Sequence, residues 1–268
     1  AGWEGDMTFY PAIKKLTLDL AADSFIGIPW GPEADRINAA FVDMVQASVA
    51  PVRRPLPFTK MRKGVKGREF LVDYFTKETH RRREEGGGQD MFSQFATATR
   101  EDGTLLPVDE VVDHMNFLMM AAHDTITSSA TSLIFLLAKY PQWQDKIRDE
   151  IIAITGGPDA EGNPRPLSYD DLGKLELTEM AFKEALRLIP PVPSMPRRAL
   201  KAFEFGGYSI PAGTPVGINI HHTHHDESLW PDPYTFDPMR FTPEKVKARH
   251  KYAWVPFGGG AHMCLGLH

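Results

Sequence analysis

The stretch FGGGAHMCLG, residues 257–266, holds the side chains of this chain that are best suited to chemistry. Cys264 is the only cysteine in 268 residues, so it has no partner for an intrachain disulfide and no second thiol for a metal site. Consecutive glycines before it would let the backbone press against a large flat group and turn its amides toward the sulfur. Amide donors or a metal would favour the thiolate. The alternative is a buried structural cysteine beside a tight turn.

A second set of reactive side chains lies in the middle of a long helix that the sequence predicts over 107–140. No Gly or Pro interrupts this segment before Pro141, and its exterior is mostly apolar, which predicts a helix buried in the middle of the domain. Asp124 and Thr125 lie near its centre. A buried acid needs a partner or access to water, and a threonine can bond back to a carbonyl one turn earlier. These two residues could handle protons, or they could be an ion pair and a back-bonded hydroxyl.

Two other clusters have ordinary structural interpretations. Glu184 and Arg187 lie three residues apart on one face of a predicted helix, and such a pair is usually a surface salt bridge of little value. The run HHTHH over 221–225 suggests a metal site, since alternate residues would share one face of a strand. No carboxylate or thiol at suitable spacing completes a closed set of ligands, so we expect no metal ion there.

The cysteine stretch resembles the haem-binding loop of the cytochrome P-450 monooxygenases. That family has Phe, Gly, any, Gly, any, Arg or His, any, Cys, any, Gly, and the matching residues here are Phe257, Gly258, Gly260, His262, Cys264 and Gly266. The resemblance implies that Cys264 is the axial thiolate ligand of a haem iron, a type of ligation that favours cleavage of the oxygen–oxygen bond. It also implies that His262 approaches a haem propionate.

The centre of the long helix resembles the oxygen-activation motif of the same family. Ala121 and Ala122 occupy its small-residue positions, which are assigned to cofactor binding, and Ala122 stands where glycine is commoner. Ile126 replaces a second hydroxyl. The roles implied by the resemblance are a proton relay through Asp124 and a hydroxyl at Thr125 that steadies bound oxygen and its waters.

The resemblance also changes the interpretation of the charged pair. The family joins a Glu-x-x-Arg pair to a downstream arginine in a buried network, and Glu184, Arg187 and Arg240 occupy those positions. A carboxylate shared between two guanidinium groups would fix the core behind the cysteine loop, which is a structural role. Arg197 best matches an arginine that the family sends to a haem propionate, with Arg198 as the neighbouring alternative.

Composition is that of an ordinary globular protein with a substantial core: 42% of residues are hydrophobic, 24% are charged, and the formal net charge is -5. Nothing in it favours nucleic-acid binding. No apolar run approaches the roughly 18 residues of a membrane span, and no signal peptide opens the chain. We therefore expect a cytoplasmic location rather than a membrane anchor. The chain begins without an initiator methionine and stops at His268, where a helix should follow Cys264. We therefore expect a fragment that lacks the N-terminal third of the domain and the helix after Cys264.

The fold class implied by the resemblance is mainly α, a partial cytochrome P-450 fold in one domain over 1–268. Its parts would be a helical distal region over 1–106, a long central helix over the haem at 107–140, and helices, a small sheet, a meander and the haem-binding loop over 141–268. Hydrophobic periodicity predicts further helices at 7–26, 33–49, 58–83, 91–98 and 142–154. Ser168 with Asp171 is typical of a helix cap, and two short strands are predicted about a turn at 206–207.

The implied activity is insertion of one oxygen atom from O2 into a lipophilic small molecule, with haem as the cofactor. Two electrons would come from a partner such as a ferredoxin, a flavodoxin or a flavoprotein reductase. Basic residues before the cysteine loop would steer an acidic partner, or they belong to a solvated helix; they are Lys245, Lys247, Arg249 and Lys251.

Two alternative functions remain at this point. One is a haem-thiolate peroxygenase, dehydratase or isomerase that needs no external electrons, against which the presence of Asp124 and Thr125 argues. The other is an inactive haem-binding fragment or sensor that carries the motifs without the chemistry.

Overall fold

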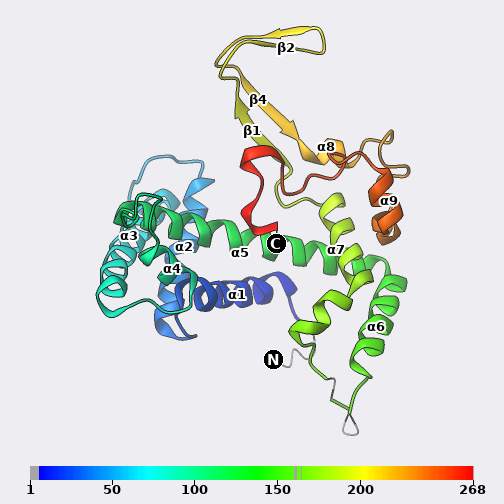
Figure 1. Cartoon of the computed structure of the whole chain (residues 1–268), viewed down its shortest axis with the longest axis horizontal. Coiled ribbons are helices and arrows are strands. Elements are labelled where there is room, and N and C mark those ends of the chain that lie inside the picture. The colour runs from blue at the N-terminus through cyan, green and yellow to red at the C-terminus, as the bar shows by residue number, and fades with distance from the viewer. Residues whose placement is uncertain (1–5, 160–161, 164, 268) are drawn as a thin grey trace. The chain divides into compact units, whose positions relative to one another are not determined.

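The computed structural model describes residues 6–159, 162–163 and 165–267, which are traced in Figure 1. The described chain is mainly helical with two small two-stranded sheets, which confirms the expected fold class. It forms two compact units, 1–127 and 128–268. The helices of the N-terminal unit are α1 (Phe9–Ala21), the π-helical turn η1 (Ala22–Ile26), α2 (Pro32–Ser48), α3 (Lys60–Glu85), α4 (Met91–Thr97) and the first part of α5 (Val108–Lys139).

The predicted helix boundaries in this unit are confirmed to within a few residues, because local capping sets them. The Thr59 hydroxyl accepts a hydrogen bond from the Arg62 backbone N–H at 3.2 Å and begins α3. The Asp90 carboxylate does the same for Ser93 at 2.9 Å and begins α4. Such caps satisfy amides that have no partner inside the helix.

Two glycines allow α2 and α3 to pack with their backbones close together. A Cβ atom added to Gly64 would lie 2.2 Å from the Ala47 Cβ, and one added to Gly67 would lie 2.6 Å from the Ala40 carbonyl oxygen. Any larger residue at these positions would force the helices apart.

The core of the N-terminal unit is apolar, with one buried arginine at its edge. Arg82 donates to the Ile26 carbonyl at 2.5 Å and to Asp90 at 2.6 Å, and its guanidinium lies 4.4 Å from the centre of the Phe92 ring. These contacts join the ends of three segments. The buried apolar residues around them are Ala21, Ala22, Ile26, Ile28, Ala34, Ile37, Ala40, Phe41, Leu71, Phe75, Phe92, Val111, Val112, Met115 and Met119.

Helix α5 exists as predicted, but the expectation that it is buried all round is wrong for this chain. Met115 and Met119 pack in the N-terminal core and Leu136 and Leu137 in the C-terminal one. Phe117 and Phe135, in contrast, are 60% and 59% exposed. The reason is that each unit covers only part of the helix surface, whereas the apolar residues of α5 surround its axis.

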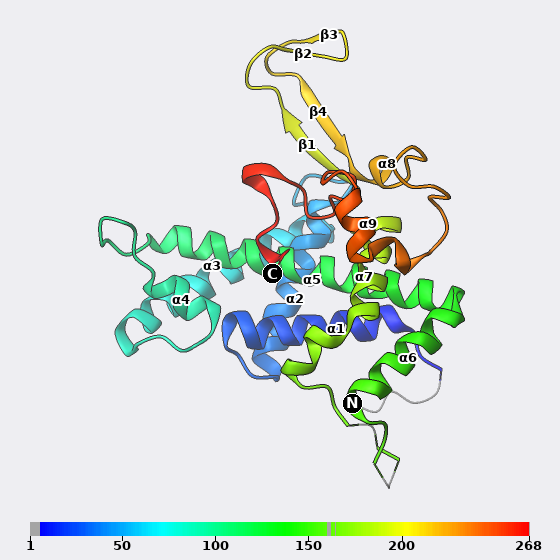
Figure 2. The same ribbon diagram turned by 45° about the vertical axis from the view of Figure 1, so that its right-hand side comes forward.

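The C-terminal unit holds the rest of α5 and the elements that lead to the cysteine loop. Its helices are α6 (Pro141–Thr155), η2 (Tyr169–Lys174), α7 (Glu176–Leu188), α8 (Ile220–His224), η3 (Pro238–Phe241), α9 (Pro243–Ala248), η4 (Gly260–His262) and η5 (Leu265–Leu267). Its strands are β1 (Ser194–Arg198), β2 (Phe203–Phe205), β3 (Tyr208–Ile210) and β4 (Pro215–Asn219). β1 pairs with β4 and β2 with β3, both antiparallel, and the β2–β3 hairpin continues from the far end of the longer ladder (Figure 2).

Local predictions in this unit have mixed outcomes. The hairpin about Gly206–Gly207 is confirmed, with both glycines at positive φ. The Ser168 cap is also confirmed, because its backbone N–H donates to Asp171 at 3.0 Å. Residues 221–225, for which a shared strand face was considered, form the end of α8 and the residue after it. Among the described residues no three His, Cys, Asp or Glu side chains are grouped so that they could hold a metal ion.

The core of the C-terminal unit has two parts. One lies among α5, α6 and α7, and the other surrounds Trp230 beneath the segment that enters the cysteine loop. The first comprises Leu136, Leu137, Trp143, Ile147, Ala181, Ala185, Leu188 and Phe236, and the second comprises Trp230, Phe241 and Ala253. Of the helices in the described ranges, none combines the length and the apolar character needed to cross a bilayer.

Candidate haem-binding site

The cysteine loop is closed by backbone hydrogen bonds. The Cys264 N–H donates to the Phe257 carbonyl at 2.9 Å, and the Gly258 N–H donates to the Val255 carbonyl at 3.0 Å. Gly258 and Gly260 both have φ of +74°, a left-handed conformation that favours glycine. The glycines therefore set the path of the loop, and they leave Cys264 exposed at its end.

The exposure of Cys264 contradicts the interpretation of this residue as a buried structural cysteine. Its exposed neighbours are apolar, since Met263 is 44% and Leu265 95% exposed. A Cβ atom added to Gly260 would meet no atom within 4 Å, so the backbone of the loop is open at that position. An exposed thiol on a glycine loop with apolar neighbours fits a large, flat, apolar ligand whose metal takes a thiolate.

Arg197 lies on β1, two residues after Met195, which borders this loop. A Cβ atom on Gly258 would come within 3.1 Å of the Met195 sulfur, and an Arg197 Nη lies 4.0 Å from the same sulfur. Arg198 instead donates to the Gly213 carbonyl at 3.0 Å, away from the loop. Of the two arginines that the sequence offered, Arg197 is the one that contacts Met195, the neighbour of Gly258. His262 is exposed within η4 of the loop itself.

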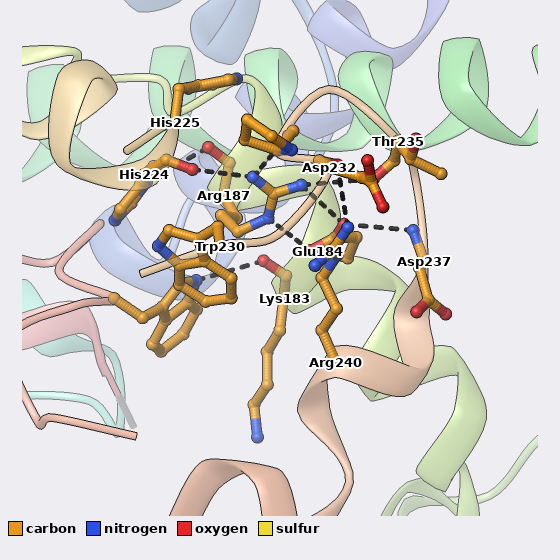
Figure 3. Close-up of polar contacts among 12 residues, drawn as sticks. Lys183, Glu184, Arg187, His224, His225, Trp230, Asp232, Thr235, Asp237 and Arg240 are labelled. Atoms are coloured by element: carbon orange, nitrogen blue, oxygen red, sulfur yellow. Dashed lines mark hydrogen bonds and ion pairs between the residues drawn. The ribbon is translucent and has the colours of Figure 1, made fainter. Parts of the chain in front are cut away.

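The structure brings Glu184, Arg187 and Arg240 together, as Figure 3 shows. Both side chains of the Glu184–Arg187 pair are fully buried, with Nε–Oε2 and Nη2–Oε1 distances of 2.7 and 2.8 Å. The Arg240 Nε lies 3.4 Å from Glu184 Oε1, and the Asp237 backbone N–H donates to that oxygen at 3.1 Å. Burial raises the pKa of the Glu184 carboxyl, and Arg187, the Asp237 amide and Arg240 oppose that shift.

Arg187 also binds three backbone carbonyls that come from a different part of the chain. It donates to the carbonyls of His224 at 2.7 Å, Pro233 at 2.8 Å and Thr235 at 3.3 Å. A guanidinium has five N–H donors in a fixed fork, so one side chain can join α7 to α8 and to the segment after it. The alternative of a surface salt bridge is therefore wrong, and the arrangement found is the buried network that the resemblance implied.

In the N-terminal unit, Asp124 forms an ion pair, which is one of the two interpretations that the sequence left open. Its Oδ1 is 3.5 Å from the Lys14 Nζ on α1 and 3.2 Å from the His123 Nε2. The Asp124 side chain is 37% exposed rather than buried, whereas His123 is 1% exposed. Burial lowers the pKa of His123, Lys14 adds to the shift, and Asp124 opposes it.

Thr125 bonds back to its own helix. Its hydroxyl donates to the Ala121 carbonyl at 2.8 Å, and two residues further on Thr127 forms a buried 2.7 Å hydrogen bond with Thr17 of α1. Ala121 and Ala122 are half-buried on this stretch. Both structural contacts that the sequence left open, an ion pair at Asp124 and a back-bond at Thr125, are thus present, and they are compatible with a role in proton handling.

Comparison with known proteins gives consistent matches. The chain is 38% identical over 262 residues to cytochrome P-450 136 of Mycobacterium tuberculosis, covering 96% of this chain and 51% of that protein. It is 28% identical over 264 residues to beta-amyrin 6-beta-monooxygenase of Solanum lycopersicum, covering 97% and 54%. The retinoic acid bound cyanobacterial CYP120A1 superposes with a TM-score of 0.83 at 30% identity, covering 96% of this chain and 57% of that one.

The chain thus spans about half the length of the curated relatives it matches. Residues 26–268 match the family described as cytochrome P450, here written cytochrome P-450. Haem is the cofactor of that family, and the exposed thiol of the glycine loop is a suitable ligand for it. The match over most of its length, together with the relatives and the fold, shows that the chain belongs to the cytochrome P-450 family.

Proposed function

We propose that the protein is a haem-dependent monooxygenase that acts on a lipophilic small molecule. In this reaction a substrate R–H, O2, two electrons and two protons give R–OH and water, and a redox partner supplies the electrons. The observation that carries the proposal is the exposed Cys264 thiol on its glycine loop in a chain of this family. One relative is named as a β-amyrin monooxygenase and another was solved with retinoic acid, which supports a lipophilic substrate class.

Several residues of this chain would hold the cofactor. Haem supplies the redox-active iron at which O2 reacts. Cys264 would bind that iron through its sulfur, and the bare backbone at Gly260 would leave room for the flat ring. Arg197, adjacent to the loop through Met195, and His262 would bind the propionates as hydrogen-bond donors to carboxylates.

Proton delivery would involve the cluster on α5. The partial exposure of the Asp124 carboxylate allows exchange of protons with water, and Lys14 and His123 restrict its orientation. Thr125 lies one residue further along, with its hydroxyl oriented by the Ala121 carbonyl. An acid in contact with water next to a fixed hydroxyl is suited to passing protons inward.

Electrons would enter near the basic residues before the loop. Lys245, Lys247 and Lys251 are exposed and suit an acidic donor such as a ferredoxin, a flavodoxin or a flavoprotein reductase. Arg249 has a different position, because its guanidinium stacks 3.9 Å from the Trp230 ring and donates to the Arg240 carbonyl at 2.6 Å. We therefore assign Arg249 to the core and the three lysines to the partner surface.

Labelled oxygen tests the proposed reaction. The full-length protein, a reducing partner and 18O2 would be incubated with retinoic acid, β-amyrin and a long-chain fatty acid as lipophilic probes. We expect one 18O atom in each product molecule and strict dependence on the electron donor. Product that forms equally well from hydrogen peroxide without a donor would establish the peroxygenase instead. Bound haem without product from any probe under either condition would contradict both enzymatic functions and favour the inactive binding protein.

Thr125→Val should uncouple electron use from product formation. Valine keeps the shape of threonine and removes its hydroxyl, so haem binding should persist while proton delivery suffers. We expect the ratio of product to hydrogen peroxide to fall by at least about tenfold, given the usual size of positioned proton transfer. Thr125→Ser, which restores a hydroxyl, should recover much of the ratio. An unchanged ratio in the valine variant would remove Thr125 from the mechanism.

A further inference from the structure

The segment 253–255 connects the C-terminal core to the cysteine loop, and we call it the loop stem. Three hydrogen bonds that involve side chains hold it to the rest of the unit. The Trp230 Nε1–H donates to the Ala253 carbonyl at 3.3 Å, and the Trp254 Nε1–H donates to the Lys183 carbonyl at 3.2 Å. The Val255 N–H donates to the His224 Nε2 at 2.9 Å. Of these side-chain partners only His224 titrates near neutral pH.

His224 is held in one tautomer by the groups on its two sides. It is 0% exposed, and its Nδ1 lies 3.2 Å from the Arg187 carbonyl. The Arg187 carbonyl can only accept a hydrogen bond and the Val255 N–H can only donate one. Nδ1 must therefore carry the proton, and Nε2 must be unprotonated. The side chain therefore bridges the last turn of α7 to the loop stem only while it is neutral.

The surroundings of His224 disfavour its charged form. Arg187 contributes a buried cation from α7, whose charge Glu184 balances, and donates to the backbone carbonyl of His224 itself. On the side of α8, His221 and His225 stack at 4.1 Å and add no negative charge. The loop stem contributes Ala253, Trp254 and Val255, which are all neutral. Burial lowers the pKa of His224 to about 4; the hydrogen bond with the Arg187 carbonyl opposes this shift, and the Arg187 charge adds to it.

We propose that neutral His224 is a positioning residue that ties the loop stem to the buried Glu184–Arg187–Arg240 network and so keeps Cys264 in place to bind haem. The inference rests on the proposed function in its last step, the ligation of haem by Cys264. Protonation would place an N–H on Nε2 against the Val255 N–H. Two donors cannot bond, so the stem would detach from α8 and the loop beyond it would relax.

The direction of the pH effect follows from the two states of the imidazole. Unfolded protein takes up the proton near the ordinary His value of 6.5, and the folded state takes it up only near 4. Between these values the unfolded state binds more protons, so acidification weakens folding through this window and has no such effect above it. Across this window the equilibrium constant for folding should fall by roughly two to three powers of ten, since each unit of pKa difference changes it tenfold.

The test uses the full-length holoprotein and two readouts between pH 7.5 and 3.5, a range that spans the pKa of about 4. The first is the spectrum of the reduced carbon monoxide complex, which reports thiolate ligation. The second is hydrogen exchange of the peptide that contains Val255, corrected for the intrinsic pH dependence of exchange, which reports the stem without reference to haem. The variants are His224→Gln, whose amide oxygen can accept the Val255 N–H without titrating, His224→Phe, and His225→Gln as a neighbouring control.

We expect the wild type and His225→Gln to lose thiolate ligation and stem protection together as the pH falls from 6.5 toward 4. His224→Gln should keep both at pH 7 and lose this acid transition. His224→Phe should show about a tenfold faster exchange of the stem and a reduced thiolate band at every pH while the rest of the chain stays protected. A His224→Gln titration identical to that of the wild type, or full stem protection in His224→Phe, would overturn the proposal. A missing thiolate band with a stem that still titrates through His224 would count against the proposed function alone.

Discussion

Cys264→Ser should abolish the thiolate-type carbon monoxide spectrum of the reduced full-length protein. A serine hydroxyl does not ionise near neutral pH, so the substitution removes the only thiolate that the sequence can supply. The Cys264 side chain is exposed, so its replacement by a side chain of similar size should leave no cavity in the folded chain. We therefore expect the band at the wavelength that names the family to fall by at least about tenfold, together with product formation.

Met263→Ala is the matched control for this substitution. Met263 is the residue before Cys264 and is 44% exposed, so its truncation disturbs the same loop without removing the sulfur ligand. It should retain the band. Survival of the thiolate spectrum in Cys264→Ser would mean that the sulfur is not the ligand, and loss of the spectrum in both variants would point to collapse of the loop.

Much of the fold could be predicted from the sequence because local signals set it. Pro141 fixes the boundary between α5 and α6, and Gly206–Gly207 fixes the β2–β3 turn, since these residues restrict or permit backbone angles by themselves. The glycine loop was found for the same reason. Its chemistry, however, came from a resemblance to known motifs, because an isolated cysteine beside glycines is usually structural.

The remaining features depend on partners that are distant in sequence. Hydrophobic periodicity predicts that α5 is apolar on all sides, but it cannot say which side of the helix this chain covers, and Phe135 stays exposed. The Lys14 contact with Asp124 joins residues far apart along the chain, and no local pattern marks it. Arg249 looked like one more basic surface residue, yet it stacks on Trp230. His224 is one of four histidines in the run HHTHH, and no local pattern marks its contacts with the Arg187 carbonyl and the Val255 N–H.

Arg187→Ala should be the most destabilising single substitution proposed for this chain. Arg187 is 0% exposed, and its removal leaves the Glu184 carboxylate buried without its main partner. It also leaves three carbonyls, of His224, Pro233 and Thr235, without the guanidinium donors that bind them. Breaking a buried ion pair from one side costs about 3–5 kcal/mol, and we expect the free energy of unfolding to fall by that amount. Urea unfolding of the full-length protein would measure it.

An exposed ion pair on the same helix provides the matched control. Glu179 and Lys183 form an i,i+4 pair in α7 at 2.6 Å, with the Glu179 side chain 65% exposed. Glu179→Ala should therefore cost less than about 1 kcal/mol. Arg187→Lys should rescue little, because an ammonium cannot reproduce the planar fork that binds a carboxylate and several carbonyls together.

The double variant Glu184→Gln with Arg187→Met separates the two parts of this cost. If the ion pair alone mattered, neutralising both partners would recover most of the lost stability, as happens when buried pairs are replaced by apolar side chains. Here the three backbone carbonyls keep their need for donors, and each unsatisfied buried polar group costs about 1–3 kcal/mol. We therefore expect the double variant to recover only part of the loss. Full recovery would show that Arg187 serves only to neutralise Glu184, and would contradict its role in joining α7 to α8 and the segment that follows.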